Sequence, residues 1–119
     1  MGSKATGDQR VVSVIFEELK KKKMFFLDSL TTSSSVCKEV ASDVGLPCVR
    51  RDVFIDHRND PEHIRLQMEK VEKVAEKAGS CVAIGHDRKV TIETLKEIIP
   101  GMKERGVKFV RLSEVLEER

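Results

Sequence analysis

Residues 24–28 read Met-Phe-Phe-Leu-Asp, four apolar side chains followed at once by a carboxylate. The same arrangement recurs at residues 48–52, Cys-Val-Arg-Arg-Asp, and at residues 81–86, Cys-Val-Ala-Ile-Gly-His. An apolar run without polar alternation is typical of a strand in a parallel sheet that is covered on both faces. Such sheets collect their ligands and catalytic groups at the carboxyl ends of the strands, so the polar residues that end these runs predict the site.

Helical patterns fill the intervals between the strands, which indicates an α/β fold with a parallel sheet. Each helix carries an apolar stripe at helical spacing. Asp8 can cap the first helix, Asp60-Pro61 starts the third with proline at its first position, and Gly45 and Gly79 are expected to end the second and third. The remaining expectations are strands over residues 24–28, 48–50, 81–85 and 107–112, a semi-extended loop over residues 51–56, a fourth helix capped by Thr91 and a last short helix capped by Ser113.

Composition narrows the choice of partners. The chain has 119 residues, of which 39% are apolar and 35% charged, and a formal net charge of +2. This near balance favours neither nucleic acid nor a membrane surface, and the four lysines at residues 20–23 are explained by a helix carboxyl end, where cations complement exposed carbonyls. No apolar run is long enough to span a membrane. The three cysteines fall on faces expected to be buried, which favours core residues over a disulfide framework.

His86 is the sharpest candidate for chemistry at a strand end. Gly85 before it allows a close backbone approach, and an imidazole at this place can serve as an acid or a base. Asp28 can face a ligand on a buried platform, or it can accept hydrogen bonds from its own loop. Arg51 and Asp52 can likewise face a ligand, or they can form an ion pair that orients the loop.

The chain alone does not contain a complete catalytic set. His57 and His63 are six residues apart, which is not by itself the spacing of a zinc site. The sequence has no H-E-x-x-H motif, glycine-rich phosphate loop, G-x-S-x-G elbow or C-x-x-C pair.

Four motifs, in order along nearly the whole chain, resemble those of the divergent polysaccharide deacetylases, relatives of the NodB-like carbohydrate esterases. They are Met1-Gly2-Ser3 with Thr6, Phe25-Phe26-Leu27-Asp28-Ser29 with Thr31, Arg51-Asp52-Val53-Phe54-Ile55-Asp56, and Ala83-Ile84-Gly85-His86 with Thr91. Three positions depart from the family pattern: Leu30 stands where arginine is usual, His57 where asparagine is usual, and Asp87 where proline is usual.

The resemblance implies an irregular, seven-stranded (β/α) barrel of the NodB type. It identifies residues 1–119 as a single partial domain, the carboxyl-terminal half of that barrel. The family's acidic pair and metal-binding histidines would lie before Met1, so we expect a zinc-like divalent metal in the full-length domain and none in this chain alone. Half a barrel leaves sheet edges and apolar surface open, which predicts self-association into a homo-oligomer.

The resemblance also implies the chemistry, in which a metal-activated water attacks an acetyl carbonyl. His86 would protonate the departing group as general acid, while Asp28 or Asp52 would orient His86 or bind sugar hydroxyls. The catalytic residues are therefore expected to be His86, Asp28 and Asp52, and the substrate-binding residues Ser29, Thr31, Arg51 and Asp56.

The resulting interpretation is a polysaccharide deacetylase-like hydrolase that acts on N- or O-acetyl groups of carbohydrate within the full-length domain and is inactive as this chain alone. One alternative is a non-catalytic carbohydrate-binding or protein-interaction module that uses the same cleft without a metal. Another is a truncated or degenerate reading frame. The chain carries no signal peptide, and the family resemblance implies the bacterial periplasm or cell envelope.

Overall fold

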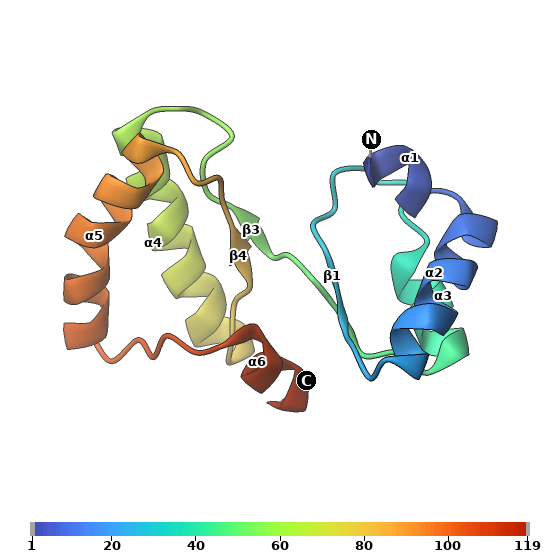
Figure 1. The fold of residues 1–119 in the computed structure, drawn as a ribbon. Coiled ribbons are helices and arrows are strands. Elements are labelled where there is room, and N and C mark those ends of the chain that lie inside the picture. Colours follow the sequence, from blue (N-terminus) through green and yellow to red (C-terminus); the bar gives the residue numbers. More distant parts are fainter. Residues whose placement is uncertain (1, 119) are drawn as a thin grey trace. The chain divides into compact units, whose positions relative to one another are not determined.

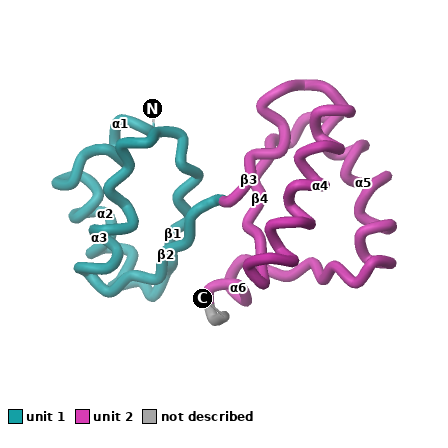
Figure 2. Tube along the Cα trace, turned by 180° about the vertical axis from the view of Figure 1, so that it is seen from behind, with its two compact units in different colours: residues 1–51 teal, residues 52–119 magenta. Residues whose placement is uncertain are grey.

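The computed structural model describes residues 2–118. Met1, the first residue of the amino-terminal motif, lies outside the described residues. Backbone contacts divide the chain into two compact units, residues 1–51 and residues 52–119 (Figure 2). No helix within residues 2–118 combines the length and apolar character that a membrane span requires.

The first unit contains three helices and one parallel strand pair (Figure 1). Strands β1 and β2 place Phe26 opposite Cys48 and Asp28 opposite Arg50. A parallel pair needs a crossover, which one of the helices provides. The elements are α1 (Gly2–Thr6), α2 (Gln9–Lys21), β1 (Phe26–Asp28), α3 (Cys37–Val44) and β2 (Cys48–Arg50).

Local signals in the sequence account for the helices of this unit. The Asp8 carboxylate accepts hydrogen bonds from the first backbone N–H groups of α2, as predicted. Gly45 ends α3 with a positive φ of 79°, which glycine adopts at no steric cost. The apolar faces of α2 and α3 meet in one core, where the ring of Phe16 lies 4.8 Å from that of Phe26.

The second unit repeats the strand–helix–strand plan. Its elements are β3 (Val53–Phe54), α4 (Pro61–Ala78), β4 (Ala83–Ile84), α5 (Lys89–Glu104) and α6 (Leu112–Glu118). Strands β3 and β4 are parallel, with α4 as the crossover between them (Figure 1). Asp60 caps α4, Pro61 takes its first position and Gly79 ends it, as predicted. Val53 and Ile55 on the strand side, Ile64 and Met68 on α4, and Met102 on α5 fill the core of this unit.

The strands depart from the sequence-based expectation in four ways. Those expected over residues 24–28 and 81–85 are shorter, Phe26–Asp28 and Ala83–Ile84. The strands pair as two separate two-stranded sheets, β1 with β2 and β3 with β4. The expected loop over residues 51–56 contains β3, and the expected strand over residues 107–112 does not form. A strand exists only where a partner takes up its backbone groups, and an apolar run alone does not specify that partner.

Two helices also begin earlier than the sequence predicted. Thr91 does not cap the fourth helix, because α5 begins at Lys89 and Thr91 lies buried in its first turn. Ser113 likewise lies inside α6 rather than before it.

The cysteines are free, and Cys37 is fully buried. Burial raises the pKa of the Cys48 thiol to about 11, with smaller contributions from Cys37 and Asp28. Burial also raises the pKa of Cys37. Both thiols are therefore protonated at neutral pH, which fits core residues rather than reactive ones.

Candidate functional site

A buried carboxylate organises the carboxyl end of the β3–β4 sheet. Asp56 follows β3 by two residues, and its side chain is 0% exposed. One oxygen, Oδ2, accepts hydrogen bonds from the His86 backbone N–H at 2.7 Å and from the Thr91 hydroxyl at 2.6 Å. The other, Oδ1, lies 2.9 Å from His86 Nδ1. A buried carboxylate with three hydrogen-bond contacts, two from His86 and one from Thr91, is well satisfied, which is the condition for keeping it ionised inside a protein.

The pKa of Asp56 reflects this balance. Burial by itself raises the pKa, but the bonds from the Thr91 hydroxyl, from the His86 backbone and from the His86 ring outweigh it, so the pKa of Asp56 is lowered below its ordinary value. Asp56 is therefore ionised at neutral pH and can only accept hydrogen bonds.

Because Asp56 only accepts, Nδ1 of His86 must donate the bond between them. In the neutral imidazole this fixes the proton on Nδ1 and leaves Nε2 as the basic nitrogen. The His86 side chain is 46% exposed, and its ring lies 5.4 Å from that of Phe54. The fold thus presents an oriented imidazole at the surface, with its anionic partner buried beneath it.

Gly85 makes this arrangement sterically accessible. A β-carbon at this position would lie 2.9 Å from Cγ1 of Ile55 and 3.5 Å from Cγ of Asp56. The first distance is shorter than a normal carbon–carbon contact, so only glycine allows the end of β4 to approach Ile55 and Asp56 so closely. The glycine before the histidine therefore sets the short bond from His86 N–H to Asp56.

Asp28 forms a second buried carboxylate centre, in the first unit. The residue is 2% exposed, and its carboxylate accepts bonds from the Ser35 hydroxyl at 2.6 Å and the Leu30 backbone N–H at 2.9 Å. Arg50 Nε lies 3.8 Å from it. Ser35 in turn accepts the N–H of Cys37, at the start of α3. These contacts hold the loop between β1 and α3, which is the loop-capping alternative that the sequence left open.

The other residues expected at the first strand ends belong to the same loop or hold it. Arg51 donates to the backbone carbonyls of Ser29 at 2.5 Å and of Leu30 at 3.2 Å. Leu30 itself has a positive φ of 53°, which is uncommon for a residue other than glycine. Thr31 is exposed, whereas Ser29 is half-buried. The guanidinium of Arg51 therefore holds the backbone after β1, and Thr31 is exposed on the same loop.

Asp52 lies at the opposite end of the β3–β4 sheet from His86. Its carboxylate accepts the backbone N–H of Val82 at 2.7 Å, and Val82 directly precedes β4. The two residues were expected to share one rim because Asp52 follows the apolar run 48–49. The short strand β3 begins directly after Asp52, so Asp52 stands at the start of a strand and His86 beyond the end of one.

Sequence reasoning singled out His86 as a candidate but assigned its partner differently. Asp28 or Asp52 was expected to orient His86, and Asp56 to bind substrate. Asp56 is instead fully buried and bonded to His86, so it is placed to position the imidazole rather than to touch a ligand. Thr91 was expected to be a helix cap and contributes its hydroxyl to the same carboxylate.

Two further histidines lie in the same unit. His63 Nε2 is 3.2 Å from His57 Nδ1, and the two rings meet edge to face with centroids 4.1 Å apart. The pKa of His63 is lowered, first by loss of water contacts and then by the nearby His57 and Arg58. Asp60 acts in the opposite direction. The ring of Phe54 lies 6.2 Å from that of His57.

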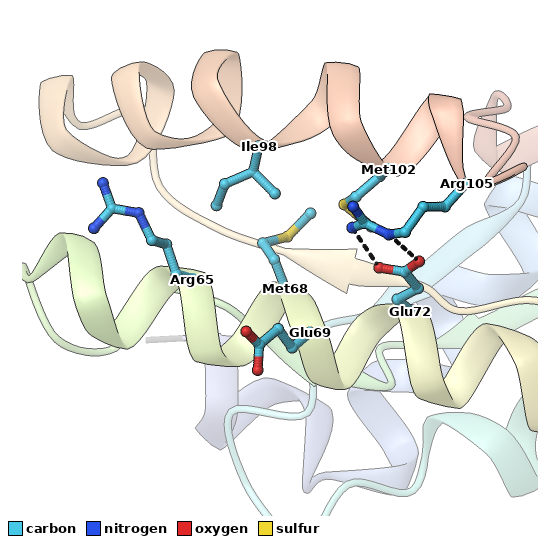
Figure 3. Close-up of a pocket in the computed structure, with 7 residues that line it drawn as sticks. All are labelled: Arg65, Met68, Glu69, Glu72, Ile98, Met102 and Arg105. Carbon is cyan, nitrogen blue, oxygen red and sulfur yellow. Dashed lines mark hydrogen bonds and ion pairs between the residues drawn. The ribbon is translucent and has the colours of Figure 1, made fainter.

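A cavity of about 150 Å³ lies between α4 and α5, away from these groups. Met68 lines it from α4 and Ile98 and Met102 line it from α5, and at one end Arg105 forms two hydrogen bonds of 2.9 Å to Glu72 (Figure 3). This pair lowers the pKa of Glu72, through the bond from Arg105. The cavity contains neither Asp56 nor His86, and we regard it as part of the packing between the two helices.

The described residues do not fit a catalytic metal centre. Within residues 2–118 no group of three or more histidine, cysteine, aspartate or glutamate side chains gathers in a way that could hold a metal ion. Catalytic zinc sites ordinarily use three protein ligands.

Comparisons with known proteins identify the family of the chain. A family model described as divergent polysaccharide deacetylase matches residues 1–116. An uncharacterized protein of Haemophilus influenzae is 36% identical over 96 residues, which are 81% of this chain and 34% of that protein. The uncharacterized protein YibQ of Escherichia coli is 28% identical over 118 residues, which are 99% of this chain and 37% of YibQ. The chain thus spans about a third of the length of these relatives.

A solved structure shares the fold. The crystal structure of the uncharacterized protein ATU2773 from Agrobacterium tumefaciens C58 matches with a TM-score of 0.92 and 18% sequence identity. The match covers 95% of this chain and 46% of that one. At this level of identity the likeness concerns the fold alone.

Proposed function

The chain belongs to the divergent polysaccharide deacetylase family, and we propose that it supplies the acid–base histidine of a carbohydrate deacetylase whose remaining catalytic groups lie elsewhere in the full-length domain. The observation that carries this proposal is the buried Asp56 carboxylate, which fixes Nδ1 of the surface residue His86 and leaves Nε2 available. A lone surface histidine is held only loosely, whereas His86 is held by its ring and by its backbone.

Hydrolysis of an acetamide or acetate ester requires a proton for the departing nitrogen or oxygen. We propose that protonated His86 donates this proton from Nε2, as general acid. The positive charge on the ring before that transfer is stabilised by the ionised Asp56 at Nδ1, in the way that a buried aspartate supports the histidine of a serine hydrolase triad. Thr91 acts through Asp56 as a positioning residue, because its hydroxyl holds Oδ2 of the carboxylate.

The proposed reaction also needs a divalent metal ion. Deacetylation of this kind uses a divalent ion to polarise the carbonyl and activate water. The described residues offer no group of three ligands for it, so we propose that the ion is held by the part of the domain outside residues 1–119. A chain that covers 46% of a related solved structure is consistent with half of an irregular (β/α)7 barrel, whose open edges would favour self-association.

The carbohydrate contacts proposed for the first unit are Ser29, Thr31 and Arg51. Thr31 is exposed and can meet a sugar hydroxyl directly. Arg51 acts on the shape of the same loop through the carbonyl groups that it holds. Asp28 supports that loop from below, through Ser35.

The test is a full-length domain in which this chain replaces the matching segment of YibQ, which aligns with 99% of it. Acetate release is measured from N- and O-acetylated oligosaccharides with added zinc, cobalt or manganese. We expect release, and we expect His86→Gln to lower kcat by about 10²–10⁴-fold, the usual contribution of a general acid. Asp87→Asn changes an exposed carboxylate in the same loop and should leave the rate unchanged.

Two results would overturn the proposal. One is a folded chimera, with a cooperative thermal transition, that releases no acetate from any acetylated carbohydrate. This result would favour the non-catalytic binding module instead. The other is activity that His86→Gln leaves intact.

A further inference from the structure

The contact between His57 and His63 has a geometry that a shared metal ion would also produce. The two nitrogens that face each other, His57 Nδ1 and His63 Nε2, are 3.2 Å apart. Two imidazole nitrogens bound to one tetrahedral zinc, each at about 2.0–2.1 Å, are separated by about 3.3 Å. The distance between the two nitrogens thus matches that of two ligands on one ion.

The fold fixes both histidines in place. His57 follows the buried residues Ile55 and Asp56, which are bound to the end of β4. His63 lies in the first turn of α4, whose start is set by the Asp60 cap and Pro61. Both positions are thus anchored by the core of one unit.

The surroundings set the class of ion. Imidazole is a ligand that suits zinc, copper and nickel, whereas magnesium and calcium prefer oxygen. The positive charge of Arg58 disfavours a cation at this place, and the negative charge of Asp60 favours one, so the two effects act in opposite directions. No third histidine, cysteine or carboxylate joins the pair in the described part of the chain, which leaves the other coordination positions to water or to an incoming ligand.

We propose that His57 Nδ1 and His63 Nε2 bind one divalent ion of the zinc class. This site differs from the acid–base centre, because it uses His57 and His63, whereas Nδ1 of His86 is already bonded to Asp56. It does not depend on the proposed deacetylase function, and its test measures binding rather than activity.

The experiment titrates the 119-residue chain with zinc chloride by calorimetry, in the presence of a phosphine reductant that keeps the thiols reduced, and repeats it with magnesium chloride. The variants are His57→Asn, which restores the residue usual in the motif, and His63→Gln. His86→Gln is the matched control, since it also removes one exposed imidazole from this unit. The expected result is 1:1 zinc binding that either pair variant weakens by at least the roughly 10–100-fold that loss of an outer-shell partner costs.

A second measurement uses the unmodified chain and therefore does not depend on whether the variants fold. Long-range ¹H–¹⁵N spectra of the unmodified chain should show zinc shifting Nδ1 of His57 and Nε2 of His63, with the protons on the opposite ring nitrogens. Absence of zinc binding, binding that survives both pair variants, binding lost only in His86→Gln, or zinc shifts confined to other side chains would each overturn the site.

Discussion

Substitution of Thr91 by valine isolates the bond that holds the Asp56 carboxylate. Thr91 is 1% exposed, and its hydroxyl donates to Oδ2 of Asp56 at 2.6 Å. Valine keeps the branched shape and removes only the donor. A hydrogen bond to a charged group contributes about 1.5–3 kcal/mol, so Thr91→Val should lower the free energy of unfolding by about that amount at neutral pH.

This loss is large for the unit that contains it. At about 0.05–0.15 kcal/mol per residue, the 68 residues from 52 to 119 have a stability of roughly 3–10 kcal/mol. With a urea dependence near 1 kcal/mol per molar, the unfolding midpoint should fall by roughly 1.5–3 M. The assay follows backbone amide signals of α4 and α5 by NMR across a urea series, so that the unfolding of this unit is observed directly.

Thr94→Val is the matched control, three residues along the same helix. Thr94 is 3% exposed, and its hydroxyl donates at 2.7 Å to the backbone carbonyl of Val90, a neutral acceptor. The same substitution there should cost only about 0.5–1.5 kcal/mol. The difference between the two losses of unfolding free energy therefore measures the part that depends on the negative charge of Asp56.

The pH dependence follows from the lowered pKa of Asp56. A carboxyl whose pKa is lower in the folded state stabilises the fold above its unfolded-state pKa, and this stabilisation is lost as the pH falls through the folded-state pKa. The loss of unfolding free energy caused by Thr91→Val should thus be largest at neutral pH. Below about pH 4 it should shrink toward the loss caused by Thr94→Val. Equal deficits at pH 7, or a Thr91→Val deficit that acid does not change, would refute an ionised Asp56 that accepts the Thr91 bond.

Three further outcomes are expected. Gly85→Ala should lower stability by about 1–3 kcal/mol in thermal unfolding, because its β-carbon would meet Ile55 at 2.9 Å, whereas Gly2→Ala meets nothing within 4 Å and should be close to neutral. Ser35→Ala should cost about 1.5–3 kcal/mol by urea unfolding, because it removes a donor from the buried Asp28 carboxylate; a cost near zero would contradict the bonding seen there. The purified 119-residue chain should release no acetate from acetylated oligosaccharides with any added divalent ion, and robust release would show that it carries a complete catalytic set.

The helices could be predicted from the sequence because their ends depend on neighbouring residues. Asp8 before α2, the Asp60–Pro61 start of α4, and the glycines that end α3 and α4 act within one turn of the chain. Each supplies a cap or a backbone conformation that the residue type itself specifies. The strand over residues 48–50 and the parallel direction of pairing were also confirmed.

The candidate site could be predicted only in part, because its contacts join residues far apart in the chain. His86 was recognised from the apolar run and the glycine before it. Its partner Asp56 lies 30 residues earlier, and several carboxylates were equally plausible from their positions alone. Asp52 was placed on the same rim because β3, only two residues long, was read as a loop.

Thr91 shows the same limit on a helix. A threonine near the start of a helical pattern is most simply read as a cap, and here α5 begins two residues earlier. The signal that could have identified its role is the number of donors that a buried carboxylate requires. Once Asp56 is known to be buried, a hydroxyl in the facing first turn of α5 becomes the expected partner.

The tautomer of His86 in the 119-residue chain tests most directly whether Asp56 prepares this histidine for proton transfer. Long-range ¹H–¹⁵N correlation spectra at a pH where the ring is neutral distinguish a proton on Nδ1 from one on Nε2. We predict a single tautomer, protonated at Nδ1, that becomes mixed in Asp56→Ala. A ring protonated mainly at Nε2, or an equal mixture that Asp56→Ala does not alter, would contradict the account.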